Sequence, residues 1–267
     1  MFCRKNKSVN VLKLAGVIHT TGRKNLCFSN IKANIDKAFK SKPKAVALLI
    51  NSPGGSPVQS EMIANYIVEK STATKVPVIT FVEDVAASGG YWLALAGEQI
   101  YSLSKSSIVG SLGVVYASFG FNKLIAQYGI DRRVHTAGNK KVSLDVFQEE
   151  KPEDIARLKN MLADVHEHFK EWVIGRRENK ITLAKEDLFS GEFWTANQGL
   201  KHGLIDGIAD LEPKLQELYG KKIKINYINL VPKKSLFSLF SSQSNLDIVD
   251  DVVSKLKSEL LWNKYGL

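Results

Sequence analysis

The segment that decides the fold is Lys44–Pro57, which reads KAVALLINSPGGSP. The unbroken apolar run after Lys44 is typical of a strand that is buried on both faces of a sheet. The Pro-Gly-Gly cluster behind it indicates a tight turn, and a helix is predicted next, over Val58–Lys70. The segment is therefore a strand-to-helix junction.

The same alternation of strand and helix extends to both sides of this junction. Upstream we predict a strand at Val9–His19 and a helix at Ser29–Lys40, with Ser29 or Asn30 as the N-cap. Downstream the pattern predicts strands at Val76–Val82, Gln99–Leu103 and Ile130–Thr136, and helices that begin near Ser88 and cover Asn122–Tyr128 and Pro152–Glu178. Repeated alternation of this kind predicts an α/β fold, layered and built on a mostly parallel sheet.

The longest predicted helix, Pro152–Glu178, carries an apolar stripe at helical spacing. The stripe consists of Ile155, Leu158, Leu162, Val165, Phe169 and Val173. We expect this face to pack against the sheet layer or against a second subunit.

Composition narrows the class of protein. The 267 residues are 44% hydrophobic and 24% charged, as in ordinary globular proteins, and the net charge is +10. No nucleic-acid-binding motif accompanies that charge, so no nucleic-acid partner is predicted. Cys3 and Cys27 belong to no metal-binding pattern and are interpreted as free thiols of a reducing compartment; no metal or cofactor is expected.

The chain changes character at Pro232. We predict one catalytic domain over residues 1–231, then a basic linker and an amphipathic helix, Leu246–Trp262, within residues 232–267. One interpretation packs this helix on the core or on a neighbouring subunit, and the other places it on a membrane surface. No run approaches the ~20 apolar residues that cross a bilayer, which predicts a cytoplasmic protein, with membrane association only through the tail.

A second glycine-rich junction, Ala86–Tyr91, reads AASGGY. In a parallel sheet, such junctions meet at the carboxyl edge, where glycines let backbone N–H groups approach a ligand closely. Neither junction matches a nucleotide-binding motif. Ser88 can cap the helix that begins there, or it can be a nucleophile with an oxyanion site beside it.

A nucleophilic serine needs a base, and histidine is the commonest one. The five histidines form no recognisable Ser-His-Asp set, and His166 and His168 have no metal-binding spacing. The segment His135–Val142 instead carries two lysines after a glycine turn. A lysine can act as base when burial and neighbouring dipoles lower its pKa.

These segments resemble peptidase family S49, the signal peptide peptidase A and SohB-like group, over roughly Val9–Leu211. The resemblance rests on several motifs in the family's order. They are Asn51-Ser-Pro-Gly-Gly, Ala86-Ala-Ser-Gly-Gly-Tyr, Gly110-Ser-Leu-Gly-Val-Val, His135-Thr-Ala-Gly followed by lysine, and Gly191-Glu-Phe-Trp-Thr-Ala-Asn-Gln-Gly-Leu-Lys-His-Gly-Leu-Ile-Asp. It implies a ClpP/crotonase-type fold and a Ser–Lys catalytic dyad.

Carried over by position, the resemblance makes Ser88 the nucleophile and Lys141 its general base. Lys140 stays open as the base, since a shift of one residue in the turn exchanges the two. Ser111 corresponds to the serine that hydrogen-bonds the base lysine and so orients it.

The resemblance also implies an oxyanion hole. Its donors would be the backbone N–H groups of Gly55 and of Ser88, with Gly54 as the alternative to Gly55.

The implied function is that of a serine endopeptidase that cleaves small or unfolded peptides, such as remnants of signal peptides, through an acyl-enzyme. The family also implies a homo-oligomer. Two alternatives stay open: a crotonase-like acyl-CoA enzyme, which shares the fold, and a non-catalytic peptide-binding or scaffold relative. Family members usually carry a membrane segment or signal at the amino terminus, and the given sequence shows none.

Overall fold

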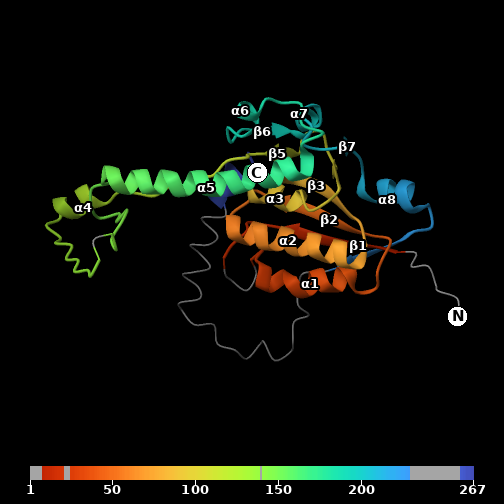
Figure 1. The fold of residues 1–267 in the computed structure, drawn as a ribbon, viewed down its shortest axis with the longest axis horizontal. Coiled ribbons are helices and arrows are strands. Elements are labelled where there is room, and N and C mark those ends of the chain that lie inside the picture. The colour runs from red at the N-terminus through yellow and green to blue at the C-terminus, as the bar shows by residue number, and fades with distance from the viewer. Residues whose placement is uncertain (1–7, 21–24, 139, 229–258) are drawn as a thin grey trace.

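The structure is a computed structural model that describes residues 8–20, 25–138, 140–228 and 259–267. Its centre is an eight-stranded sheet in the order β6-β5-β3-β2-β1-β8, with β4 paired to both β3 and β7 (Figure 1). All pairings are parallel except that of β5 with β6. The strands are β1 (Ser8–Ala15), β2 (Ala45–Ser52), β3 (Val78–Ala87), β4 (Gln99–Ser102), β5 (Ile108–Gly110), β6 (Phe193–Thr195), β7 (Gly207–Ile208) and β8 (Lys224–Ile228).

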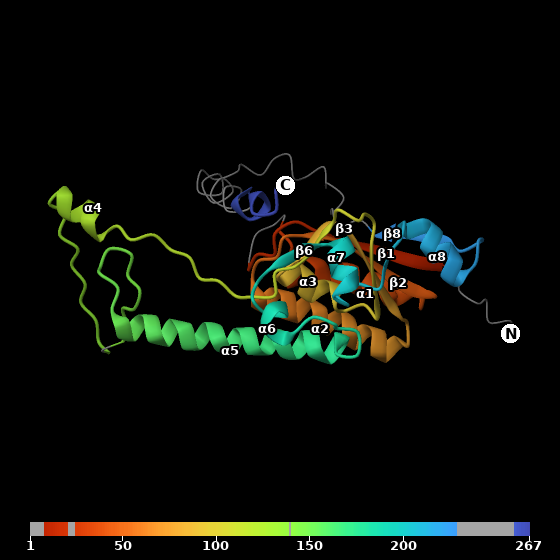
Figure 2. The same cartoon turned by 90° about the horizontal axis from the view of Figure 1, so that it is seen from above.

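Helices cover the two faces of the sheet unequally. The helices are α1 (Phe28–Lys40), α2 (Pro57–Thr74), α3 (Gly89–Ala94), α4 (Asn122–Gln127), α5 (Pro152–Arg177), α6 (Lys185–Leu188), α7 (Ala196–Lys201) and α8 (Leu211–Tyr219). The larger apolar core joins one face to residues of α1, α2, α3 and α5, and the smaller one joins the other face to α8 (Figures 1 and 2). The prediction of a layered, mostly parallel α/β fold is confirmed.

Strand β2 shows why the opening sequence segment governs this architecture. Val46, Leu48 and Ile50 belong to the larger core, whereas Ala47 and Leu49 belong to the smaller one. Successive side chains of a strand point to opposite faces, so an unbroken apolar run is needed when both faces are covered.

Three local predictions were wrong. The N-cap of α1 is Cys27, not Ser29 or Asn30, and its side chain makes no capping hydrogen bond. β3 extends to Ala87, beyond the predicted end at Val82. Ile130–Thr136 forms no strand: these residues are irregular and mostly exposed, because no neighbouring strand of the described chain pairs with them.

Residues 114–151, which we call the arm, leave the body after the Gly110–Gly113 segment and lead to the start of α5, which lies away from the body, and α5 itself runs back to the body (Figure 2). Among the described residues of the arm, the one helix is the short α4, which buries none of its residues. Its exposed apolar side chains include Val115 (82% exposed), Phe119 (77%) and Tyr128 (71%). A monomer seldom leaves such a group of apolar side chains in water, so the arm has the character of a contact surface.

Helix α5 links the arm to the body, and its apolar stripe behaves differently at the two ends. Phe169 and Val173 are buried in the larger core. The other four predicted stripe residues, near the arm, are only partly buried. Within one chain, therefore, only the body end of the apolar stripe is buried in the core.

The predicted linker, most of the predicted tail helix and the domain boundary at residue 231 lie outside the described residues. Of the tail, residues 259–263 are helical. Among the helices that the structure describes, none is both long and apolar enough to cross a bilayer.

Candidate active site

Ser88 stands at the sharp turn between β3 and α3. Its backbone has φ 51° and ψ −122°, a conformation that non-glycine residues rarely adopt and that is typical of functional positions. Although Ser88 occupies the N-cap position of α3, its side chain makes no capping hydrogen bond. The capping role, which local sequence favours, is therefore absent, and the half-buried hydroxyl is left for other chemistry.

The Gly54–Gly55 turn lies directly against Ser88. A β-carbon on Gly54 would lie 2.9 Å from both the Ser88 β-carbon and the Gly89 amide nitrogen. At Gly55, a β-carbon would collide with the carbonyl of Ile18. Both glycines have positive φ, 102° and 142°, so the junction needs glycine for its conformation and for its close approach.

The backbone amides at this junction are not equally available. The turn is tied to Ile18 by two hydrogen bonds, which use the Gly54 carbonyl and the Ser56 amide and not the Gly55 amide. The Ser88 amide donates to the Gly110 carbonyl at 2.8 Å, so it is already used within the fold. This argues against Ser88 as an oxyanion donor. The Gly89 amide, beside Gly54, is better placed, and sequence reasoning missed it.

Ser111 lies beside Ser88 because β3 and β5 are paired in register, with Ala87 opposite Gly110. The residue is only 4% exposed, and its own φ is 54°. Its amide donates to the Glu192 carbonyl at 2.7 Å, which anchors it to the strand end before β6. The strand register thus brings Ser88 and Ser111 close together, while the predicted role of Ser111 in orienting a lysine stays a prediction.

Lys140 and Lys141 are not part of this cluster within one chain. Both are exposed and lie in the arm, in a shallow surface depression that they form with Ala137 and Gly138. The arm extends to the far end of α5 from the body, which contains α3 (Figure 2). The turn is nevertheless organised, since the Lys141 amide donates to the Gly138 carbonyl at 3.1 Å.

A different lysine reaches the site. Lys264 Nζ donates to the Ser111 hydroxyl at 3.4 Å, and the neighbouring Tyr265 ring packs edge-on against Phe193 with a centroid distance of 5.0 Å. Burial raises the pKa of the Tyr265 phenol, and a hydrogen bond with Ser111 opposes that shift. Sequence reasoning missed both residues, because the tail carries no motif and its pattern predicts only an amphipathic helix.

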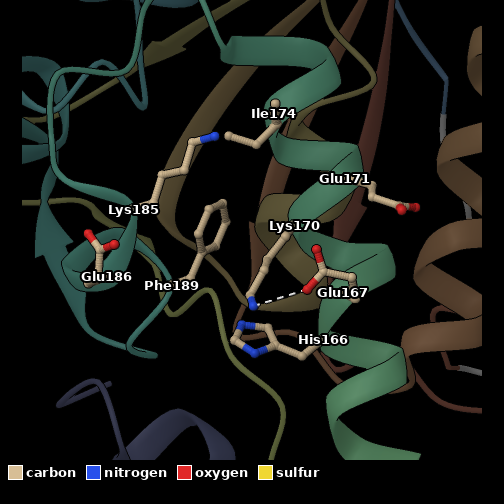
Figure 3. A pocket seen from close by; sticks show the side chains of 8 residues that line it. All are labelled: His166, Glu167, Lys170, Glu171, Ile174, Lys185, Glu186 and Phe189. Carbon is tan, nitrogen blue, oxygen red and sulfur yellow. Dashed lines mark hydrogen bonds and ion pairs between the residues drawn. The ribbon is translucent and has the colours of Figure 1, made fainter.

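Helix α5 packs against the segments that hold Ser88 and Ser111. His166 Nε2 bonds the Leu112 carbonyl at 2.9 Å, next to Ser111. Phe169 stacks on Trp92 of α3 with a centroid distance of 4.6 Å. His166 also lines an open groove between α5 and α6, where Lys170 pairs with Glu167 near Phe189 (Figure 3).

A buried ion pair joins α5 to the residue before β7. Arg177 of α5, 2% exposed at its side chain, bonds Asp206 at 2.7 Å and also donates to the Gly203 carbonyl. Burial alone would raise the pKa of Asp206, but hydrogen bonds from Arg177, Lys180 and the Ile100 amide outweigh it and lower the pKa. Within the described ranges, no group of three or more His, Cys, Asp or Glu side chains could hold a metal ion.

The layered, mostly parallel sheet, with a strained serine at a glycine-lined junction, places the chain in the α/β class. Within that class, the family model of peptidase family S49 matches residues 70–222, more than half of the chain. The chain belongs to peptidase family S49.

Individual relatives agree with this assignment over most of the chain. A signal peptide peptidase SppA of Enterococcus faecium, whose name is provisional, is 28% identical over 81% of this chain and 64% of its own length. The chloroplastic serine protease SPPA of Arabidopsis thaliana is 28% identical over 94% of this chain and 36% of its own length.

A Brucella abortus protein named Na(+)/H(+) antiporter NhaA is 42% identical over 97% of this chain, but this match covers only 37% of that protein. The antiporter name describes the longer protein. Our chain spans about a third to two thirds of the length of these relatives.

Proposed function

We propose that this chain is a serine endopeptidase in which Ser88 is the nucleophile and Lys141 of a second copy is the general base. The observation that carries the proposal is the separation of the two residues. Ser88 lies in the body with its hydroxyl free of any cap, while Lys141 lies exposed on an arm that extends away from the body. A second copy is therefore needed to complete the site.

The arm has the features that such a role requires. Its exposed Val115, Phe119 and Tyr128 would be buried by a neighbouring body, as would the partly used stripe of α5. Internal contacts pre-shape it: Arg132 pairs with Asp145 at 2.9 Å, and the Phe121 amide donates to the Val146 carbonyl at 2.6 Å. Repeated arm-to-body contacts of this head-to-tail kind close into a ring when the rotation allows it.

In the proposed reaction, Lys141 in its neutral form takes the proton of the Ser88 hydroxyl while the Ser88 oxygen attacks the peptide carbonyl. The oxyanion that forms accepts hydrogen bonds from the Gly55 and Gly89 amides. Lys141 then gives the proton to the leaving amine, which departs and leaves an ester on Ser88. Water, deprotonated by Lys141, hydrolyses the ester and restores the serine. Ser111 would orient the lysine amine.

Substrates in this proposal are extended, unfolded peptides with small or apolar side chains at the cut, including remnants of signal peptides. An extended peptide could lie beside the Gly113–Tyr116 segment, which forms no strand in this chain. No observation at the site specifically favours the crotonase-like alternative or the scaffold alternative.

Mixing two inactive variants tests the proposal. Ser88→Ala and Lys141→Ala should each abolish peptide hydrolysis. If the dyad forms between copies, an exchanged equimolar mixture should recover about one quarter of wild-type activity, because half of the serines and half of the lysines are intact and they combine at random.

The control mixture pairs Ser88→Ala with the double variant Ser88→Ala/Lys141→Ala and should stay inactive. Lys140→Ala should keep its activity. Two inactive single variants whose mixture stays inactive after exchange would place the dyad within one chain and contradict the proposal.

A further inference from the structure

The last described residues of the chain, 259–267, touch the site at a single serine. Lys264 donates to the Ser111 hydroxyl, and Tyr265 covers Phe193, the residue after the Glu192 carbonyl that anchors Ser111. The segment has internal order, since the Tyr265 amide and the Leu267 amide both donate to the Trp262 carbonyl. The contact is thus made by a folded end of the chain and not by one isolated side chain.

The position of Lys264 matters because of what Ser111 is expected to do, and here the inference rests on the proposed function. Ser111 is nearly buried and its backbone is fixed, so its hydroxyl can serve an amine only from the open side. In the proposed enzyme that amine belongs to Lys141 of a second copy. In this chain the same hydroxyl already accepts from Lys264.

We propose that residues 259–267 are an intramolecular ligand of Ser111, with the Lys264 ammonium in the place that the arriving base lysine needs. The two lysine amines cannot occupy the same place beside one nearly buried hydroxyl, so Lys264 excludes the incoming lysine from Ser111 by position. The free subunit is therefore latched, and the tail must leave Ser111 before the arm of a second copy completes the site.

The contacts predict a weak, reversible latch. Lys264 is exposed and makes one hydrogen bond at Ser111, at 3.4 Å. Tyr265 is half-buried against a partly exposed Phe193, and its phenol also hydrogen-bonds Ser111. An exposed contact of a charged side chain, such as that of Lys264, changes the equilibrium constant between tail-bound and tail-free Ser111 by about two- to fivefold. Loss of the aromatic contact as well should bring the total to about tenfold.

The position of residues 259–267 is tested first, by cross-linking. The experiment uses dilute full-length protein that carries Cys3→Ser, so that this native thiol does not react. The pair Phe193→Cys and Tyr265→Cys should be joined within one chain by a short bismaleimide linker. The control pair Lys222→Cys and Tyr265→Cys should not be joined. Failure of the first pair to link would overturn the inference.

Competition is tested by self-association, measured by sedimentation velocity in a Ser88→Ala background. Deletion of residues 259–267 should strengthen association about tenfold, and Lys264→Met about two- to fivefold. Lys264→Arg, which keeps a cation, and Lys222→Met, an exposed lysine elsewhere, should leave it unchanged. Unchanged or weakened association in the deletion variant would overturn the inference.

These readouts separate the latch from the peptidase proposal, since neither requires catalysis. Stronger association of the truncated protein, without peptide hydrolysis by any variant, would retain the latch and reject the peptidase. If hydrolysis occurs, the truncated enzyme should reach full specific activity at a lower protein concentration than the complete chain. A truncated enzyme that needs a higher concentration would overturn the latch.

Discussion

The neighbourhood of Ser88 and the arm that carries Lys141 are built in opposite ways. Ser88 follows a strand of the central sheet, its amide is bonded to Gly110, and glycines pack against it on two sides. The arm has one short helix with no buried residue, and its apolar side chains face water. The difference teaches that the Ser88 side of the proposed site is formed within a single chain, whereas the proposed base lies on a segment that the body of the same chain does not cover.

Replacing the nucleophile should have the largest effect. Ser88→Ala should lower peptide hydrolysis by at least about 10³-fold, as for other serine nucleophiles, while the melting temperature stays close to that of the wild type. The matched control is Ser106→Ala, an exposed serine on a nearby loop, which should keep full activity. Substantial hydrolysis by Ser88→Ala would refute the assignment of the nucleophile.

The ion pairs of the two regions should differ in their contribution to stability. Arg177→Ala removes the buried partner of Asp206, which keeps Lys180 and the Ile100 amide, and should lower the free energy of unfolding by about 1.5–3 kcal/mol. Arg132→Ala removes an arm pair whose arginine is 42% exposed, so solvent screens the pair, and it should cost about 1 kcal/mol. Urea unfolding of both variants measures this, and equal costs would contradict the contrast drawn here.

Helix α5 allows the comparison within one element. Val173→Ala, in the buried half, should cost about 2 kcal/mol of stability in dilute protein. Leu162→Ala, near the arm, should cost less in dilute protein but should weaken self-association. If sedimentation shows no such weakening, the arm end of α5 is not an interface.

The smallest expected effect is on the stability of the fold at acidic pH. The pKa of Asp206 is lowered in the folded protein, so its ionised form stabilises the fold above the unfolded-state pKa, and this contribution is lost as the pH falls through the folded-state value. Asp206→Asn should therefore flatten the decline of stability in acid, whereas Asp131→Asn in the arm should not. Urea midpoints measured from pH 6 down to pH 3 are the readout, and parallel declines would show that Asp206 does not titrate this way.

Sequence reasoning was accurate wherever short-range pattern decides the structure. The apolar run before Asn51 needs two covered faces, and the structure provides them. The role of Ser111 in orienting the base lysine, which the resemblance implied, stays a prediction. The predicted strand at Ile130–Thr136 failed because strand propensity needs a neighbour, and no described part of one chain supplies it.

By itself, the sequence determined the layered α/β fold, because strand burial and glycine turns are local requirements of consecutive residues. The peptidase family was implied by the resemblance of several motifs and not by those local patterns. Only the tertiary structure decided the rest. It released Ser88 from a capping role, engaged its amide with Gly110, brought Lys264 to Ser111 and left Lys141 on an exposed arm. Each of these depends on contacts between residues distant in the chain, and no local pattern encodes such contacts.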